Sequence, residues 1–181
     1  MALDLMLERT SPAVRAWLPD VAGWTKRSDP GPLLELRLAS RAVTGRTGPI
    51  RVLLVEDDTT IAEMYRVQLD FDGFSVTVVS TGEAALAAMA ASRPDIVLLD
   101  LLLPDRSGLE VMVEINKKFP EHPPVVILSN YGEPTMIERG LSLGAIEYLV
   151  KSRVTPDSVS RSIPGWIEND QDSDQGPSPR H

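Results

Sequence analysis

The sequence contains no cysteine, two histidines, few aromatic residues and no long uninterrupted apolar run. Without cysteine, the chain can form no disulfide, thiolate zinc site or cysteine nucleophile. The longest apolar stretch is broken by an acid at residue 100, and it is far too short to span a bilayer. The N-terminus has acid in its apolar part and no basic start, so it does not resemble a secretory signal. These absences predict an intracellular, cytoplasmic protein with no membrane partner.

The net charge of −8 argues against nucleic-acid binding by the whole surface. The charge is unevenly distributed, because residues 50–163 hold seventeen acidic and ten basic side chains, whereas residues 1–49 hold five and seven. The middle of the chain is therefore a distinct acidic unit.

The two ends of the chain read as appendages. Residues 1–49 contain five prolines and four glycines, which predict a poorly ordered N-terminal extension. Residues 167–181, rich in Asn, Asp, Gln, Ser, Gly and Pro, predict a disordered acidic tail. One ordinary domain remains, at residues 50–166.

Within this domain, short apolar runs rich in branched residues alternate with segments of helical spacing. The predicted strands are 51–55, 74–79, 95–99, 125–128 and 146–150, and the predicted helices are 59–71, 83–91, 109–119 and 133–143. A last helix begins at Thr155-Pro156-Asp157, and Pro164-Gly165 is predicted to end it early.

Five strands separated by helices require crossover connections, so the pattern predicts an α/β fold with a five-stranded parallel sheet and helices on both faces. We expect the flavodoxin-like strand order 2-1-3-4-5. In such sheets, ligands bind beyond the carboxyl ends of the strands. Four predicted strands end in polar or charged residues that could bind a ligand or react, namely Glu56-Asp57, Asp100, Ser129 and Lys151.

Asp100 is the most informative of these residues, because it stands alone in the apolar run from Ile96 to Leu103. Burying an unpaired carboxylate costs several kcal/mol unless it is paired or bound to a metal. Either Asp100 marks the point where the strand surfaces, or it is held in place for chemistry.

Each candidate has an ordinary structural interpretation when it is taken alone. Glu56-Asp57-Asp58 precedes a helix, where acids cap free amide groups, and Asp58 fits that role. Ser129 and Lys151 could be a strand-end hydroxyl and a solvated lysine. Together, however, three carboxylates in one crevice exceed what one lysine can neutralise. Oxygen ligands without His or Cys favour Mg²⁺, and such a site suits phosphoryl transfer.

At this point the pattern resembles the receiver domain of two-component response regulators, over about residues 50–160. The residues that carry the resemblance are Val55-Glu56-Asp57-Asp58, Asp100 with Pro104 and Gly108, Ser129, Gly144-Ala145 and Tyr148-Leu149-Val150-Lys151, in the family's order and spacing.

The resemblance implies a role for each residue. Asp100 would be the phosphoacceptor, taking a phosphoryl group from a phosphohistidine on a kinase. Asp57 would bind Mg²⁺ directly, Glu56 through water, and Leu102 through its backbone carbonyl. Lys151 would pair with the phosphoryl oxygens. Ser129 would turn toward the phosphoryl group, and Tyr148 would move from an outward to an inward rotamer.

Two departures from the family pattern bear on the site. The lysine is followed by Ser152 rather than proline, so the state of the Lys151–Ser152 peptide bond is open. Leu102 and Tyr131, two positions beyond Asp100 and Ser129, are bulky and poor at positioning a hydrolytic water. They predict slow self-dephosphorylation.

The flanks are too short for an output module, which predicts a stand-alone receiver. Its partners would be a histidine kinase or phosphotransfer protein and a downstream protein target; a homodimer is left open. It would be no enzyme beyond its own phosphorylation and dephosphorylation. One alternative is a degenerate receiver that acts as a constitutive interaction module. Another is an aspartyl-nucleophile phosphohydrolase, which needs a second acid where Leu102 stands.

Overall fold

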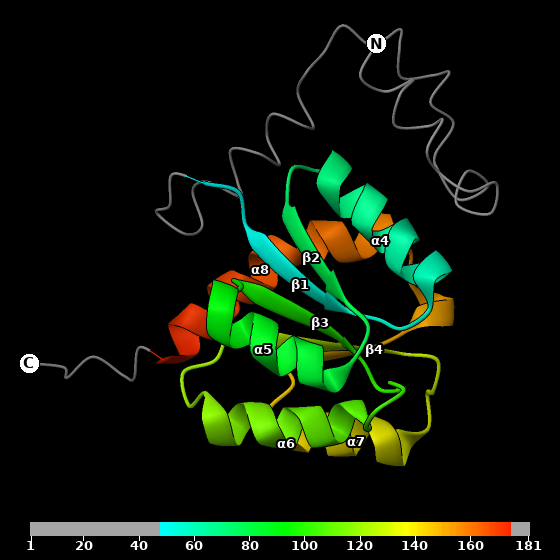
Figure 1. The fold of residues 1–181 in the computed structure, drawn as a ribbon, viewed down its shortest axis with the longest axis vertical. Coiled ribbons are helices and arrows are strands. Elements are labelled where there is room, and N and C mark those ends of the chain that lie inside the picture. The colour runs from blue at the N-terminus through cyan, green and yellow to red at the C-terminus, as the bar shows by residue number, and fades with distance from the viewer. Residues whose placement is uncertain (1–47, 175–181) are drawn as a thin grey trace, which may run out of the picture.

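The computed structural model describes residues 48–174, with side chains described as far as residue 170. Five strands form one parallel sheet in the order β2-β1-β3-β4-β5 (Figure 1). Their bounds are β1 Arg51–Val55, β2 Ser75–Val79, β3 Ile96–Asp100, β4 Val125–Ser129 and β5 Glu147–Val150. The predicted fold class and strand order are confirmed.

Helices cover both faces of this sheet (Figure 1). One face packs against α4 (Thr59–Phe71) and α8 (Pro156–Asp174), and the other against α5 (Gly82–Ser92), α6 (Gly108–Lys118) and α7 (Pro134–Ser142). Every residue of β3 and β4 is buried, as expected for central strands covered on both sides. Two apolar cores, one on each face, therefore hold the sheet rigid between its helix layers.

The local signals at the helix starts agree with the sequence. Asp58 is the N-cap of α4, and its carboxylate accepts hydrogen bonds from the backbone N–H groups of Thr60 and Ile61. Ser107 and Glu110 form a capping box at the start of α6. Because these caps satisfy amide groups that have no partner within the helix, they fix where each helix begins. The predicted capping role of Asp58 matches this geometry.

The prediction that Pro164-Gly165 ends the last helix is wrong, because α8 continues through Pro164 to Asp174. A proline inside a helix costs about 3 kcal/mol. Here Val159, Ile163 and Ile167 recur on one face of α8 and are all buried in the core shared with α4. Their burial stabilises the helix by more than the proline costs, at roughly 1.5–3 kcal/mol for each side chain.

A buried polar group also joins α8 to the end of α4. The Asp72 carboxylate accepts hydrogen bonds from the Gln68 side-chain amide at 2.8 Å and from the Ser160 hydroxyl at 2.5 Å. All three residues are buried, so these bonds satisfy groups that water cannot reach. They fix the position of α8 along α4.

The acidic tail was predicted to start at residue 167, but this residue lies inside α8 and its side chain is buried. The predicted N-terminal extension, up to residue 47, and the tail from residue 175 lie outside the described residues. Within residues 48–174, no helix has the length and apolar character needed to cross a membrane.

Candidate functional site at the carboxyl end of the sheet

The sheet brings the predicted site residues to one edge. Glu56 and Asp57 directly follow β1, Asp100 is the last residue of β3, Ser129 is the last residue of β4, and Lys151 directly follows β5. Because β1, β3, β4 and β5 are parallel neighbours, their carboxyl ends meet at the same edge. Each of the four neighbouring strands thus contributes to a single crevice.

Three carboxylates cluster there. Glu56, Asp57 and Asp100 can each offer one oxygen such that all three atoms lie within 4.8 Å of one another. Glu56 is 2% exposed and Asp100 4%, whereas Asp57 is exposed. Two of the three acids therefore have little contact with solvent, which makes their charges costly.

Lys151 lies between the two buried acids. Its Nζ is 2.5 Å from Glu56 Oε2 and 2.9 Å from Asp100 Oδ2, and its side chain is almost fully covered. The lysine follows β5 in the short 3₁₀ turn η2 (Lys151–Arg153). Every peptide bond among residues 48–174 is trans, including the one between Lys151 and Ser152. The lysine reaches Asp100 without the proline of the family pattern.

The charges in this crevice do not balance, since one lysine faces three acids. The pKa of Glu56 is raised from 4.5 to about 7, mainly because burial disfavours its charged form; Lys151 opposes this rise and the nearby Asp100 adds to it. The Glu56 carboxylate is buried, and its close neighbour is the Lys151 ammonium, which lies 2.5 Å from Oε2 and also contacts Asp100. Clustered carboxylate oxygens that share a single lysine are ligands that fit a hard cation such as Mg²⁺.

The loop after Asp100 closes tightly on the strand end. The Gly108 N–H donates to the Leu101 carbonyl at 2.9 Å, and Leu102 and Ser107 form an antiparallel bridge. A Cβ at residue 108 would lie 2.2 Å from the Asp100 carbonyl oxygen. Gly108, noted in the sequence as a motif residue, is required here because the backbone of α6 passes directly against the phosphoacceptor candidate.

The two predicted switch residues both bind Tyr131. The Ser129 hydroxyl oxygen accepts a hydrogen bond from the Tyr131 N–H at 3.1 Å, and the Tyr148 hydroxyl donates to the Tyr131 carbonyl at 2.8 Å. Tyr148 is buried, with its ring near Gly140 of α7, where a Cβ would lie 3.1 Å from the ring. Its side chain is thus packed against α7 in this structure, with its hydroxyl bonded to the Tyr131 backbone.

Leu102 and Tyr131 flank the crevice with exposed side chains, 51% and 42% exposed respectively. Both are therefore available to a molecule that approaches the acid cluster.

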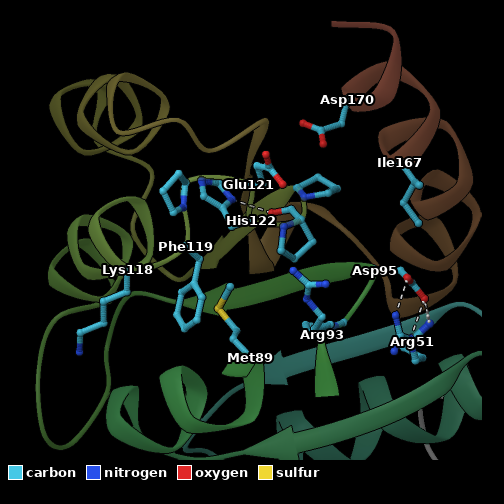
Figure 2. A pocket seen from close by; sticks show the side chains of 14 residues that line it. Arg51, Met89, Arg93, Asp95, Lys118, Phe119, Glu121, His122, Ile167 and Asp170 are labelled. Atoms are coloured by element: carbon cyan, nitrogen blue, oxygen red, sulfur yellow. Dashed lines mark hydrogen bonds and ion pairs between the residues drawn. The ribbon is translucent and has the colours of Figure 1, made fainter. Parts of the chain in front are cut away.

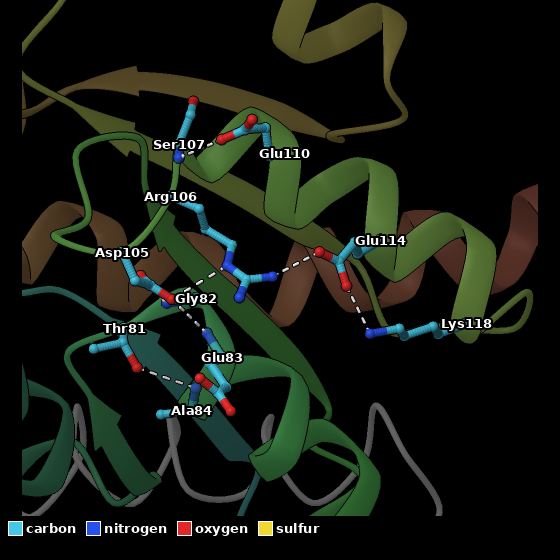
Figure 3. A network of polar contacts seen from close by, with 10 residues as sticks. All are labelled: Thr81, Gly82, Glu83, Ala84, Asp105, Arg106, Ser107, Glu110, Glu114 and Lys118. Atoms are coloured by element: carbon cyan, nitrogen blue, oxygen red, sulfur yellow. Dashed lines mark hydrogen bonds and ion pairs between the residues drawn. The ribbon is translucent and has the colours of Figure 1, made fainter.

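Sequence reasoning missed the role of Asp105 and Arg106. Figure 3 shows the Asp105 carboxylate at the start of α5, where it accepts hydrogen bonds from the Gly82 and Glu83 N–H groups at 2.8 and 3.0 Å. Arg106 contacts Asp105 and, at 2.6 Å, Glu114 of α6. Pro104-Asp105 is typical of a turn, but the N–H groups of Gly82 and Glu83 that Asp105 binds are more than twenty residues away in the sequence.

A pocket of about 680 Å³ lies at the opposite, amino end of the sheet (Figure 2). Apolar groups such as Met89, Phe119 and Ile167 line it together with charged groups. Two of its charged groups form a pair, because Arg51 holds Asp95 through guanidinium contacts at 3.0 and 3.2 Å. No second group of three metal-binding side chains occurs in the described part of the chain, so this pocket offers no comparable chemistry.

Comparisons with known proteins agree on the family. The model of the response regulator receiver domain matches residues 52–161. The transcriptional regulatory protein TcrX of Mycobacterium tuberculosis is 35% identical over 103 residues, 57% of this chain and 44% of that protein. The DNA-binding response regulator MtrA of Mycobacterium leprae is 34% identical over 122 residues, 67% of this chain and 53% of that protein. The chain thus spans about half the length of these relatives.

Solved structures give the same result. The signal receiver domain of a LuxO repressor protein from Vibrio parahaemolyticus has a TM-score of 0.63 and 28% identity, covering 71% of this chain and 99% of that one. A CheY-like receiver domain from Methanospirillum hungatei has a TM-score of 0.64 and 25% identity, covering 70% and 99%. From its fold, its matching residues and these likenesses, the chain belongs to the receiver domain family of two-component response regulators.

Proposed function

We propose that this chain is a phosphorylation-activated switch in which Asp100 accepts a phosphoryl group from a phosphohistidine on a kinase or phosphotransfer protein. In this step the phosphorus–nitrogen bond of the donor breaks, a phosphorus–oxygen bond forms to an Asp100 carboxylate oxygen, and the imidazole leaves. The observation that carries the proposal is the convergence of Asp100, two further acids and Lys151 at one end of a receiver-domain sheet.

Glu56, Asp57, Asp100 and the backbone carbonyl of Leu102 would hold Mg²⁺. The ion would neutralise the acids and the oxygens of the incoming phosphoryl group. The burial of Glu56 and Asp100 and the clustering of the three acids around a single lysine support this assignment. The absence of His and Cys from the cluster favours a hard cation over zinc.

Lys151 would pair with the phosphoryl oxygens once Asp100 is modified. Its Nζ already lies 2.9 Å from an Asp100 carboxylate oxygen, so a group attached to that carboxylate would be within its reach. A charge-assisted contact of this kind is roughly twice as strong as a neutral hydrogen bond. Lys151 would therefore favour the phosphorylated state and the transfer that produces it.

Ser129 and Tyr148 would convert the new charge into a change of shape. A phosphoryl group adds about −1.5 to −2 charges and strong acceptor oxygens. If the Ser129 hydroxyl turned toward it, the Tyr131 N–H would lose its acceptor, and Tyr131 also supplies the acceptor for the Tyr148 hydroxyl. Shifting such an element from mostly off to mostly on takes about 5.5 kcal/mol of differential binding.

The receiver would act through protein partners rather than by reading nucleic acid itself. Its net charge of −8 opposes contact with phosphate backbones. The MtrA relative is described as DNA-binding, and this chain covers 53% of it. The proposal of a protein target therefore concerns the receiver portion, and the stand-alone organisation stays a prediction.

Incubation with acetyl phosphate and Mg²⁺, followed by intact-protein mass spectrometry, tests the proposal. The wild type should gain one phosphoryl group, and the Asp100→Asn variant should gain none. EDTA should abolish the gain, because the three acids would then repel the donor. A wild type that takes up no phosphoryl group from acetyl phosphate or from a histidine-kinase donor would instead fit the degenerate receiver. Continuous release of phosphate from a generic phosphate ester would instead fit the phosphohydrolase.

A further inference from the structure

The loop of residues 101–107 joins the phosphoacceptor candidate to α6. Its base is fixed by the Gly108–Leu101 hydrogen bond and the Leu102–Ser107 bridge. These contacts leave the tip of the loop to be held by something else. The Leu102 carbonyl, proposed above as a metal ligand, lies where the base of this loop meets the tip, so a shift of the tip would reach the site through Leu102.

Asp105, at the tip, is fixed to a different helix. Its Oδ1 accepts from Gly82 N at 2.8 Å and its Oδ2 from Glu83 N at 3.0 Å, both at the start of α5 (Figure 3). These first N–H groups of a helix have no partner within it, and a carboxylate complements them. The same two bonds hold the pKa of the Asp105 carboxyl below its usual value, the Gly82 bond most strongly.

Arg106 fixes the tip from the other side. Its Nε lies 3.2 Å from Asp105 Oδ2, and its Nη1 lies 2.6 Å from Glu114 Oε1 on α6. Gly82 packs against its aliphatic part, since a Cβ there would lie 2.7 Å from Arg106 Cγ. The tip is therefore held between α5 and α6 by bonds to both helices.

An ordinary helix cap would not need this arrangement. Thr81, the N-cap of α5, already accepts a hydrogen bond from Ala84 N at 3.1 Å through its side chain. Asp105 adds two bonds that connect the helix to the loop across 22 and 23 residues of sequence. Losing Asp105 would leave the local cap of α5 in place and free the tip of the loop from α5.

We propose that Asp105 is a positioning residue for the phosphoryl site, which holds the 101–107 loop, and with it the Leu102 carbonyl, in the conformation that binds Mg²⁺. This inference rests on the proposed function of the acid cluster. Residues that orient metal ligands from outside the ligand set typically contribute 10- to 100-fold to metal affinity. Asp105 belongs to this class because it touches neither the acids nor, in the proposal, the ion.

Isothermal titration of the unphosphorylated full-length protein with Mg²⁺, well below its unfolding temperature, tests the inference without relying on activity. Asp105→Ala should raise the dissociation constant for Mg²⁺ about tenfold. Arg106→Met, which keeps the packed stem and removes the guanidinium, should raise it less.

Two matched controls separate positioning from capping and from charge. Thr81→Ala removes a cap of the same helix, and Glu83→Gln removes one negative charge at the same helix start. Both should keep the dissociation constant within about twofold of the wild type, because neither side chain connects to the loop. Thermal unfolding should show that Thr81→Ala destabilises the protein about as much as Asp105→Ala.

The inference is overturned if Asp105→Ala binds Mg²⁺ as the wild type does, or if either control weakens binding as much as Asp105→Ala. Mass spectrometry with acetyl phosphate distinguishes this failure from that of the proposed function. If the wild type is phosphorylated on Asp100 and Asp105→Ala binds Mg²⁺ normally, only the proposed role of Asp105 is contradicted. If the wild type neither binds Mg²⁺ nor becomes phosphorylated, both the proposed function and the role of Asp105 are contradicted.

Discussion

Both ends of the sheet hold charged side chains, and they use them differently. At the amino end, Asp95 receives both guanidinium contacts of Arg51 and its backbone N–H, so the acid is fully matched. At the carboxyl end, Glu56 and Asp100 share one lysine, and a third acid, Asp57, lies within reach of both.

This difference distinguishes structural charge from functional charge. A matched pair such as Arg51–Asp95 connects neighbouring segments and needs no further partner. An excess of buried negative charge destabilises the fold until something positive arrives. The carboxyl end is thus a candidate cation-binding site, because its acids outnumber its lysine.

The largest expected effect comes from removing the lysine. Lys151→Met should slow phosphorylation of Asp100 by acetyl phosphate about 10²-fold or more, because the phosphoryl oxygens lose their charged partner. Phosphate-affinity electrophoresis over time measures the rate. Arg51→Met removes a cation from the amino end and should leave the rate within a few-fold of the wild type. Equal losses in both variants would contradict the comparison.

The next largest effect concerns the backbone contact behind Asp100. Gly108→Ala places a Cβ 2.2 Å from the Asp100 carbonyl oxygen, so the loop must move, at a cost of about 1–3 kcal/mol or more. Chemical denaturation measures the free energy of unfolding. Gly165→Ala is the matched control, since Gly165 lies on the exposed face of α8 with nothing within 4 Å of the added Cβ, and it should stabilise by up to about 1 kcal/mol.

A pH dependence follows from Glu56. Its pKa is about 7 in the folded chain against 4.5 ordinarily, so the folded state binds the proton more tightly. In EDTA, the free energy of unfolding should therefore fall as pH rises from 4.5 through about 7. Mg²⁺ should restore stability, and more at the upper end of this range, because it binds the ionised acids.

Denaturation curves across this pH range, with and without Mg²⁺, provide the measurement. Glu56→Gln should flatten the dependence, whereas Asp95→Asn at the amino end should leave its slope unchanged. A flat profile in the wild type would show that the acids of the carboxyl end carry no unbalanced charge.

The smallest expected effect concerns the exposed side chains beside the crevice. The Leu102→Asn, Tyr131→Glu double variant should lose its acyl phosphate faster than the wild type, by about tenfold, because polar groups can position a hydrolytic water. Decay in Mg²⁺ after removal of the donor measures this. Faster decay in the wild type would contradict the prediction of slow self-dephosphorylation.

Much of the site could be predicted from the order of residues along the chain. Parallel strands place all their carboxyl ends at one edge, so Glu56, Asp100 and Lys151 had to converge once the strands were identified. The predicted strands and the first four predicted helices agree with the structure to within one residue at nearly every end, because their periodic apolar patterns and caps are local signals.

Other features depended on contacts between distant residues. The course of α8 through Pro164 reflects burial of its apolar face against α4, which outweighs the local helix-breaking signal. The bonds from Asp105 to α5 and from Tyr148 to Tyr131 join residues far apart in sequence. No pattern in a short window encodes such pairs.

The sequence by itself determined that three acids, a hydroxyl and a lysine would meet at one sheet edge, because strand direction follows from the alternation of strands and helices. Only the tertiary structure decided which acids are buried, that Lys151 contacts Glu56 as well as Asp100, and that the loop after Asp100 is held by α5. Burial and pairing depend on how the helices pack, and that packing sets the dielectric surroundings and the distances on which charge interactions depend.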